Sequence, residues 1–140
     1  MIVILTGQPG SGKTTIARGL AEEGFFVVDG DQLRDVAPQG YDRQGRLDNV
    51  ANAHLIARYA SREGFWVVVA LVQPYAEQRD LLKSEGAFEV HLVGKPGERP
   101  PEYAVADYEA PEKPDLIIDT DQVGEDEAIR TVYRAVANLP

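Results

Sequence analysis

The segment GQPGSGKT at residues 7–14 constrains this chain more than any other feature. It follows the apolar run at residues 2–5 and opens a stretch of helical character, the context that the pattern G-x-x-x-x-G-K-[ST] requires. Glycines in such a loop let backbone N–H groups surround an anion, and the following helix N-terminus adds partial positive charge. A chance match in a chain of 140 residues is on the order of one in several hundred. The pattern therefore predicts a loop that binds the phosphates of a nucleoside triphosphate.

The side chains of this loop suit ATP and Mg²⁺. Lys13 is expected to reach the β- and γ-phosphates, and the Thr14 hydroxyl is a ligand type that Mg²⁺ accepts. The predicted nucleotide-binding residues are Gly7, Gly10, Ser11, Gly12, Lys13, Thr14 and Thr15. The pattern alone does not separate kinases from GTPases or motors. A base-reading Asn-Lys-x-Asp segment is absent and 140 residues leave little room for motor machinery, so a small-molecule kinase is favoured.

Short apolar runs alternate with helical patterns along the chain. The runs occupy residues 2–5, 25–28, 65–71, 88–93 and 116–118. Runs rich in Val and Phe without polar alternation are typical of strands covered on both faces, and their alternation with helices implies right-handed crossovers. The sequence predicts an α/β protein with the three-layer P-loop nucleoside-triphosphate hydrolase fold and a parallel, roughly five-stranded sheet.

Two helical stripes and one proline-rich stretch complete the predicted organisation. The first stripe ends before Gly64 and consists of Val50, Ala53, Ala57 and Ala60. The second consists of Ala128, Val132, Ala135 and Leu139. Residues 94–114 hold most of the prolines and show neither a helical nor an alternating pattern of apolar residues. We therefore expect a loop over the sheet edge. Trp66, beside a valine run, is expected in the core of a single domain spanning residues 1–140.

Charge and residue usage exclude several classes of function. Fourteen Lys and Arg against 23 Asp and Glu give a formal net charge of −9, which disfavours nucleic acid and anionic membranes as partners. The chain has no cysteine, which excludes disulfides, thiolate metal sites and a cysteine nucleophile and fits the cytoplasm. The apolar run at residues 2–5 is too short for a membrane span or a signal-peptide core.

Two carboxylates follow the second apolar run, in the segment DGDQLR at residues 29–34. We expect Asp29 and Asp31 at the carboxyl end of a strand beside the first, where open α/β sheets bind ligands. One acid can order the waters of Mg²⁺ while the other takes a proton from an attacking hydroxyl. The structural alternative is that Asp29 ends a strand and Asp31 caps a helix. The residues alone leave these interpretations even.

Seven segments in one order carry a resemblance to a known family. They lie at residues 7–17, 29–34, 40–41 with 46–50, 74–75 with 79–80, 88–90, 108–111 and 119–120. On these segments the chain resembles the adenylylsulfate kinases, which transfer the γ-phosphate of ATP to the 3′-hydroxyl of adenosine 5′-phosphosulfate (APS). The resemblance covers nearly the whole chain and implies a small nucleotide acceptor.

The resemblance assigns roles to matched positions. Asp31 matches the acid nearest the acceptor hydroxyl, and Asp29 matches its partner on the metal side. The implied catalytic residues are thus Lys13, Asp31 and Asp29, and the implied metal ligands are Thr14 and Asp29. The implied acceptor-binding residues are Asp31, Arg34, Tyr41, Arg46, Asn49, Val72, Gln73 and Pro74. Tyr41 stands where the family has an aromatic ring that stacks on adenine. As alternatives, Arg46 is a solvated charge at a helix start and Tyr41 a surface aromatic; His54 and His91 are interpreted as structural.

The chain departs from the family at two places. Gln73 replaces the usual serine, although an amide can still hydrogen-bond an acceptor. Only residues 94–107 stand where the family has a longer lid, and none of the lid motifs is present; Lys95, Arg99 and Tyr103 are candidate substitutes or simple loop residues. A shortened lid should weaken acceptor selectivity and favour ATP hydrolysis.

Three points consequently stay open at the level of sequence. The acceptor can be another nucleotide or a nucleic-acid hydroxyl, since a local basic groove could override the negative net charge. A non-catalytic nucleotide-binding module is a third interpretation, and the retention of both Asp29 and Asp31 argues against it. The family also implies a homodimer as one option, but no apolar stripe in the sequence can be assigned to a partner.

Overall fold

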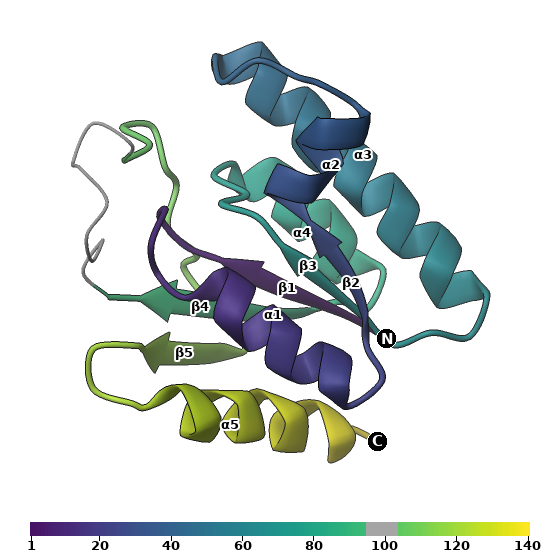
Figure 1. The fold of residues 1–140 in the computed structure, drawn as a ribbon, viewed down its shortest axis with the longest axis vertical. Helices are drawn as coiled ribbons and strands as arrows, with labels where there is room; N and C mark the ends of the chain where they lie inside the picture. Colours follow the sequence, from purple (N-terminus) through teal and green to yellow (C-terminus); the bar gives the residue numbers. More distant parts are fainter. Residues whose placement is uncertain (95–103) are drawn as a thin grey trace.

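A computed structural model describes residues 1–94 and 104–140 (Figure 1). The strands in the described residues are β1 (Ile2–Thr6), β2 (Phe26–Asp29), β3 (Val67–Ala70), β4 (Phe88–Val93) and β5 (Leu116–Asp119). The helices are α1 (Lys13–Glu22), α2 (Gly30–Val36), α3 (Arg43–Arg62), α4 (Ala76–Ser84) and α5 (Glu125–Ala137). Lys95, Arg99 and Tyr103 lie outside the described residues.

All described strand pairs are parallel and the sheet order is β2-β3-β1-β4-β5. The predicted parallel α/β fold is confirmed. The expectation that β2 lies beside β1 is wrong, because β3 separates them. Burial explains the order: every residue of β3 is buried, whereas β2 leaves Phe26 40% exposed and takes the edge of the sheet.

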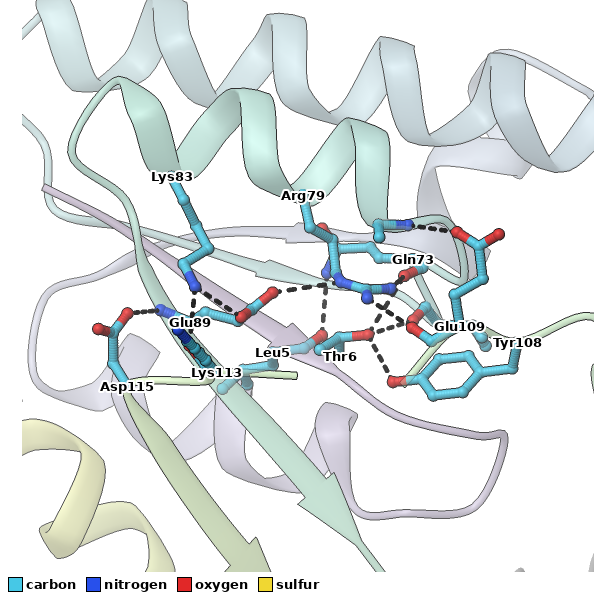
Figure 2. Close-up of polar contacts among 12 residues, drawn as sticks. Leu5, Thr6, Gln73, Arg79, Lys83, Glu89, Tyr108, Glu109, Lys113 and Asp115 are labelled. Carbon is cyan, nitrogen blue, oxygen red and sulfur yellow. Dashed lines mark hydrogen bonds and ion pairs between the residues drawn. The ribbon is translucent and has the colours of Figure 1, made fainter. Parts of the chain in front are cut away.

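Helices cover both faces of the sheet. Figure 1 shows α1 and α5 together on one face, and their buried side chains form one core with β1, β3 and β4. On the other face α3 packs over β2 and β3, and α4 lies beside it (Figure 2). The predicted stripe of α3 is confirmed, since Val50, Ala53, Ala57 and Ala60 are all buried in this second core.

Two predictions about apolar side chains are wrong. The buried stripe of α5 runs through Ala128, Val132 and Val136, while Ala135 is only half-buried and Leu139 lies beyond the end of the helix. A constant step of four residues keeps this short stripe on the sheet. Trp66 is 40% exposed; it precedes β3 and packs edge-on against the Phe25 ring, with centroids 5.5 Å apart.

The described part of the proline-rich stretch, residues 104–114, contains neither helix nor strand: Tyr108 contacts Thr6 at the carboxyl end of β1, and the Lys113 carbonyl accepts from Lys83 near the end of α4. The Gln8 side chain holds Val105 by two hydrogen bonds, donating to its carbonyl at 3.0 Å and accepting from its N–H at 2.9 Å. This loop therefore lies against the segment at residues 7–14. None of the described helices is both long and apolar enough to cross a membrane.

Candidate active site

The loop at residues 7–14 connects β1 to α1 at the carboxyl edge of the sheet (Figure 1). Gly10 and Gly12 have φ values of 85° and 99°, in the left-handed region that side chains disfavour. Gly12 is also the residue before α1, and no side chain caps the first N–H groups of this helix. The N–H groups of this first turn and the helix dipole form a site for a phosphate group.

Lys13 is held over this loop. Its Nζ donates to the carbonyls of Gly7 and Gln8, both at 2.9 Å, and to the Ser11 hydroxyl at 3.3 Å. Thr120, at the end of β5, supports the loop from outside by donating its hydroxyl to the Ser11 carbonyl at 3.0 Å. Sequence reasoning matched Thr120 to the family without giving it a role.

Asp29 lies between the phosphate loop and α2. One carboxylate oxygen accepts the backbone N–H groups of Asp31 and Gln32 at 3.0 and 3.1 Å, so Asp29 caps α2. The other oxygen accepts the Thr14 hydroxyl at 3.3 Å. Asp29 therefore ends β2 and caps α2, while Asp31, which the structural alternative placed at the cap, stands in the first turn of α2.

A cavity of about 660 Å³ joins these elements, a volume within the usual range for small-ligand sites. The predicted residues that line it are Gly10, Gly12, Lys13, Thr14, Thr15, Asp29, Asp31, Arg34, Tyr41, Arg46, Asn49, Val72, Gln73 and Pro74. Gly7 and Ser11 are buried in the loop and do not line the cavity. Sequence reasoning missed the wall formed by Ala104 and Val105, because nothing in the proline-rich stretch marks them.

Arg34 and Tyr41 form a pair on one side of the cavity. The Arg34 guanidinium lies over the Tyr41 ring, 4.2 Å from its centroid, and the ring is 70% exposed. The Arg34 Nε is buried and has no hydrogen-bond partner among the described residues. The buried Asn49 also has a polar atom without a partner. Its amide nitrogen donates to the Gly30 carbonyl at 3.5 Å, but its Oδ1 has no hydrogen-bond partner among the described residues.

Arg46 is paired inside the protein. It donates to the Tyr41 carbonyl at 2.6 Å, to the Tyr75 hydroxyl at 3.2 Å and to the Asp107 carboxylate at 3.0 Å. Sequence reasoning missed Asp107, which directly precedes the matched segment at residues 108–111 and carries no motif of its own.

Gln73 lines the cavity and has a strained backbone conformation. It is not a glycine, yet its φ is 50°. Its amide nitrogen donates to the carbonyls of Leu5 and Val69 at 2.9 and 3.1 Å, and its Oε1 lies 2.7 Å from the His54 Nε2. Because Oε1 can only accept, His54 carries its proton on Nε2. The amide is thus committed to the core in this conformation rather than presented to an acceptor.

Histidines at the base of the site are kept neutral. Burial lowers the pKa of His54, although its hydrogen bond to Gln73 acts in the opposite direction. Burial likewise lowers the pKa of His91, with a further contribution from the positive charge of Arg79. His91 stacks on the Tyr108 ring at a centroid distance of 6.1 Å.

A buried ion pair between Arg79 and Glu89 joins α4 to β4 next to Gln73 (Figure 2). Arg79 Nε contacts Glu89 at 3.2 Å, with the two side chains 1% and 2% exposed. Arg79 also donates to the Gln73 carbonyl at 2.7 Å and to the Glu109 carbonyl. These bonds tie the strained backbone at Gln73 to α4 and β4.

The Tyr108 hydroxyl connects the returning loop to β1. The Thr6 hydroxyl donates its single proton to the Val72 carbonyl at 2.6 Å, so the Tyr108 hydroxyl, 2.9 Å away, is the donor to Thr6. Burial raises the pKa of Tyr108, which keeps this donor protonated.

No group of three or more His, Cys, Asp or Glu that could hold a metal occurs in residues 1–94 and 104–140. Mg²⁺ does not need one, because it keeps several waters and takes one or two protein ligands in addition to substrate phosphates. The Thr14 hydroxyl and the Asp29 carboxylate, 3.3 Å apart, are oxygen ligands of the right type.

A phosphate loop after the central strand of a parallel sheet, with two acids across the cavity, defines a P-loop kinase. The family model described as Adenylylsulphate kinase matches residues 1–94, about two thirds of the chain, and the protein belongs to this family. The resemblance seen in the sequence is confirmed.

Three known proteins illustrate the relationship. A relative from Halalkalibacterium halodurans, named "Probable adenylyl-sulfate kinase", is 31% identical over 94% of this chain and 80% of its own length. The Mycobacterium tuberculosis APS kinase in complex with AMPPNP and APS is 27% identical, with a TM-score of 0.83 over 98% of this chain and 97% of that one. The cytidine diphosphoramidate kinase of Campylobacter jejuni is 36% identical over 56% of this chain and 51% of its own length.

Proposed function

We propose that this kinase transfers the γ-phosphate of ATP to the 3′-hydroxyl of APS. One observation carries the proposal: a single cavity joins the phosphate loop to Asp29 and Asp31 and to the cationic and aromatic side chains of Arg34 and Tyr41. The same cavity thus offers groups that can bind the phosphates of ATP and groups that can bind a nucleotide acceptor. Relatives named adenylyl-sulfate kinase over most of the chain support the choice of acceptor.

On the donor side, the N–H groups of the loop and Lys13 bind the phosphates of ATP. The Lys13 ammonium has three donors and exchanges its present carbonyl partners for phosphate oxygens. Thr14 and Asp29 would hold Mg²⁺, which neutralises charge on the transferring phosphoryl group when bound. The N–H groups of the loop and Lys13 fix the γ-phosphoryl group for attack from the acceptor side.

On the acceptor side, Asp31 orients the 3′-hydroxyl and takes its proton. The new bond from the 3′-oxygen to the γ-phosphorus forms as the bond to the β–γ bridging oxygen breaks, and ADP leaves. Arg34, whose Nε lacks a partner among the described residues, binds the anionic tail, and the Asn49 Oδ1 can accept a sugar hydroxyl. Arg46, which is paired with Asp107, is a second cation for the same anionic tail, and Tyr41 stacks on the base.

A second candidate acceptor is a different nucleotide. The stretch shared with the cytidine diphosphoramidate kinase has the higher identity, although it spans only about half of each chain. Only residues 94–107 stand in place of the longer family lid, which leaves room for another base. A cytoplasmic location, where ATP is available, belongs to the proposal; the homodimer and the single domain over residues 1–140 stay predictions.

The test compares two acids on the same helix. Asp31 lines the cavity, whereas Asp35 is exposed on α2 and does not. Each variant, Asp31→Asn and Asp35→Asn, is incubated with MgATP and APS, and the 3′-phosphorylated product is followed by mass spectrometry. We expect Asp35→Asn to match the unaltered protein and Asp31→Asn to lose roughly 10²- to 10⁴-fold in rate. Near-normal turnover by Asp31→Asn would show that Asp31 does not take the proton of the acceptor hydroxyl.

A further inference from the structure

Four side chains form a compact charged cluster at the acceptor end of the cavity. Asp107 accepts Arg43 and Arg46, each at 3.0 Å, and the Tyr75 hydroxyl at 2.9 Å. Arg43 also lies over the Tyr75 ring, 4.2 Å from its centroid. Two guanidinium groups and a phenol converging on one point form a binding site for an oxyanion, and here the protein's own carboxylate fills it.

The Asp107 carboxylate is held in this position by its neighbours along the chain. On one side, Val105 makes two hydrogen bonds to the Gln8 side chain. On the other side, the Tyr108 hydroxyl binds Thr6, and the Glu109 N–H donates to the Pro74 carbonyl at 2.8 Å. The backbone on both sides of Asp107 is therefore anchored to the elements that build the active site.

The cluster is also held in its charged form. Partial removal from water acts to raise the pKa of Asp107, but the Tyr75 hydrogen bond and the charges of Arg46 and Arg43 outweigh it and lower the pKa. Asp107 is ionised at neutral pH, so one negative charge offsets two positive ones. Arg46, 77% buried, is the member of the cluster that lines the cavity, while Arg43 is 60% exposed.

We propose that Asp107 is a specificity-determining residue that weakens the binding of acceptors carrying an anionic group at Arg46. Such a group must displace the carboxylate or lie beside it, and like charges at close range repel. Arg34, whose Nε has no hydrogen-bond partner in residues 1–94 and 104–140, then becomes the favoured anchor for acceptor charge. The remaining lone-pair capacity of Asp107 suits a hydroxyl donor instead. This inference rests on the proposed function, because it concerns the acceptor end of the same site.

The experiment measures binding of a charged and an uncharged acceptor. With saturating MgADP on the phosphate loop, APS and adenosine are titrated calorimetrically into the unaltered protein, Asp107→Asn and the control Glu112→Gln. Glu112 is an exposed acid in the same stretch of chain and does not line the cavity. We expect Asp107→Asn to tighten APS binding about tenfold and to leave the Kd for adenosine within about twofold, while Glu112→Gln changes neither.

A second variant tests the same idea with the opposite sign. Arg43→Gln removes the outer cation of the cluster and leaves Asp107 to Arg46 and Tyr75, so APS binding should weaken while adenosine binding stays constant. Weaker APS binding by Asp107→Asn, or equal changes for APS and adenosine, would overturn the inference and make Asp107 a positioning residue for Arg46.

Failure of the proposed function would look different. In that case the unaltered protein transfers no phosphate to APS. The role of Asp107 can still be tested by titrating sodium sulfate in the presence of MgADP and following the Arg46 Nε–H signal by NMR. We expect sulfate to bind Asp107→Asn more tightly than the unaltered protein. Equal or weaker sulfate binding by the variant contradicts the role of Asp107.

Discussion

Replacing Arg79 with methionine should destabilise the protein far more than an ordinary polar substitution. Arg79 and Glu89 are 1% and 2% exposed, and their Nε–Oε2 distance is 3.2 Å. Methionine has a similar length, but it leaves the Glu89 charge buried without its main partner. Lys83, 3.0 Å from the other Glu89 oxygen, compensates in part. The carbonyls of Gln73 and Glu109 also lose the donors that fix them (Figure 2).

The expected cost follows from these contacts. Breaking a buried ion pair by removing one partner costs about 3 to 5 kcal/mol, and the retained Lys83 contact places Arg79→Met near the lower end. For a chain of 140 residues, each kcal/mol lowers Tm by roughly 3 °C. We therefore expect Arg79→Met to lose about 3 kcal/mol and to melt about 10 °C lower.

A double-mutant cycle in urea separates charge from packing. Glu89→Gln alone strands the Arg79 charge and should cost about the same as Arg79→Met. If uncompensated charge is the cause, the double variant should cost about 2 kcal/mol less than the sum of the single variants. Unfolding free energies are obtained by linear extrapolation with the slope checked for each variant. Costs that add to within about 0.5 kcal/mol would refute the reasoning.

Three further predictions concern the loop, Gln73 and pH. Lys13→Ala should abolish phosphate transfer and shift Tm by less than about 2 °C, as seen by calorimetry. Gln73→Ser removes the amide donor to the Leu5 and Val69 carbonyls and the acceptor of the His54 N–H, and should cost about 2 to 3 kcal/mol in urea unfolding. Because burial lowers the pKa of His54 from its ordinary 6.5, the unfolded chain binds a proton that the folded one refuses, so stability should fall as pH drops below about 6.5. If His54 causes this loss, the stability of His54→Gln should depend less on pH than that of the unaltered protein. The same pH dependence in both proteins would exclude His54 as the cause.

The sequence predicted the sheet and the phosphate site because both depend on local pattern. Valine at residues 67–69 could only be an interior strand, and the glycines at residues 10 and 12 adopt the left-handed φ values that a phosphate loop uses. The order of the strands was harder to predict. β2 follows β1 in the chain but pairs with β3, because burial on both faces, and not chain order, decides which strands lie at the centre of the sheet. Trp66 was misplaced for a similar reason, because one position before a buried strand the chain is already at the edge of the core.

Side-chain pairing across distant segments could not be predicted. Asp107 reaches Arg46 over 61 positions, and Arg79 of α4 pairs with Glu89 of β4; neither pair has a periodic or motif signal. The Gln73 amide was expected to face an acceptor, but three backbone carbonyls and His54 draw it into the core. Spacing gives the positions of such residues along the chain, whereas tertiary packing decides which groups they meet.

Acceptor-dependent release of ADP tests the central claim most directly. The unaltered protein is supplied with MgATP, and ADP is measured with and without APS. The proposed function predicts that APS accelerates ADP release and that each ADP formed is matched by one 3′-phosphorylated APS. ADP release at the same rate with and without APS, and with no phosphorylated product, would contradict it.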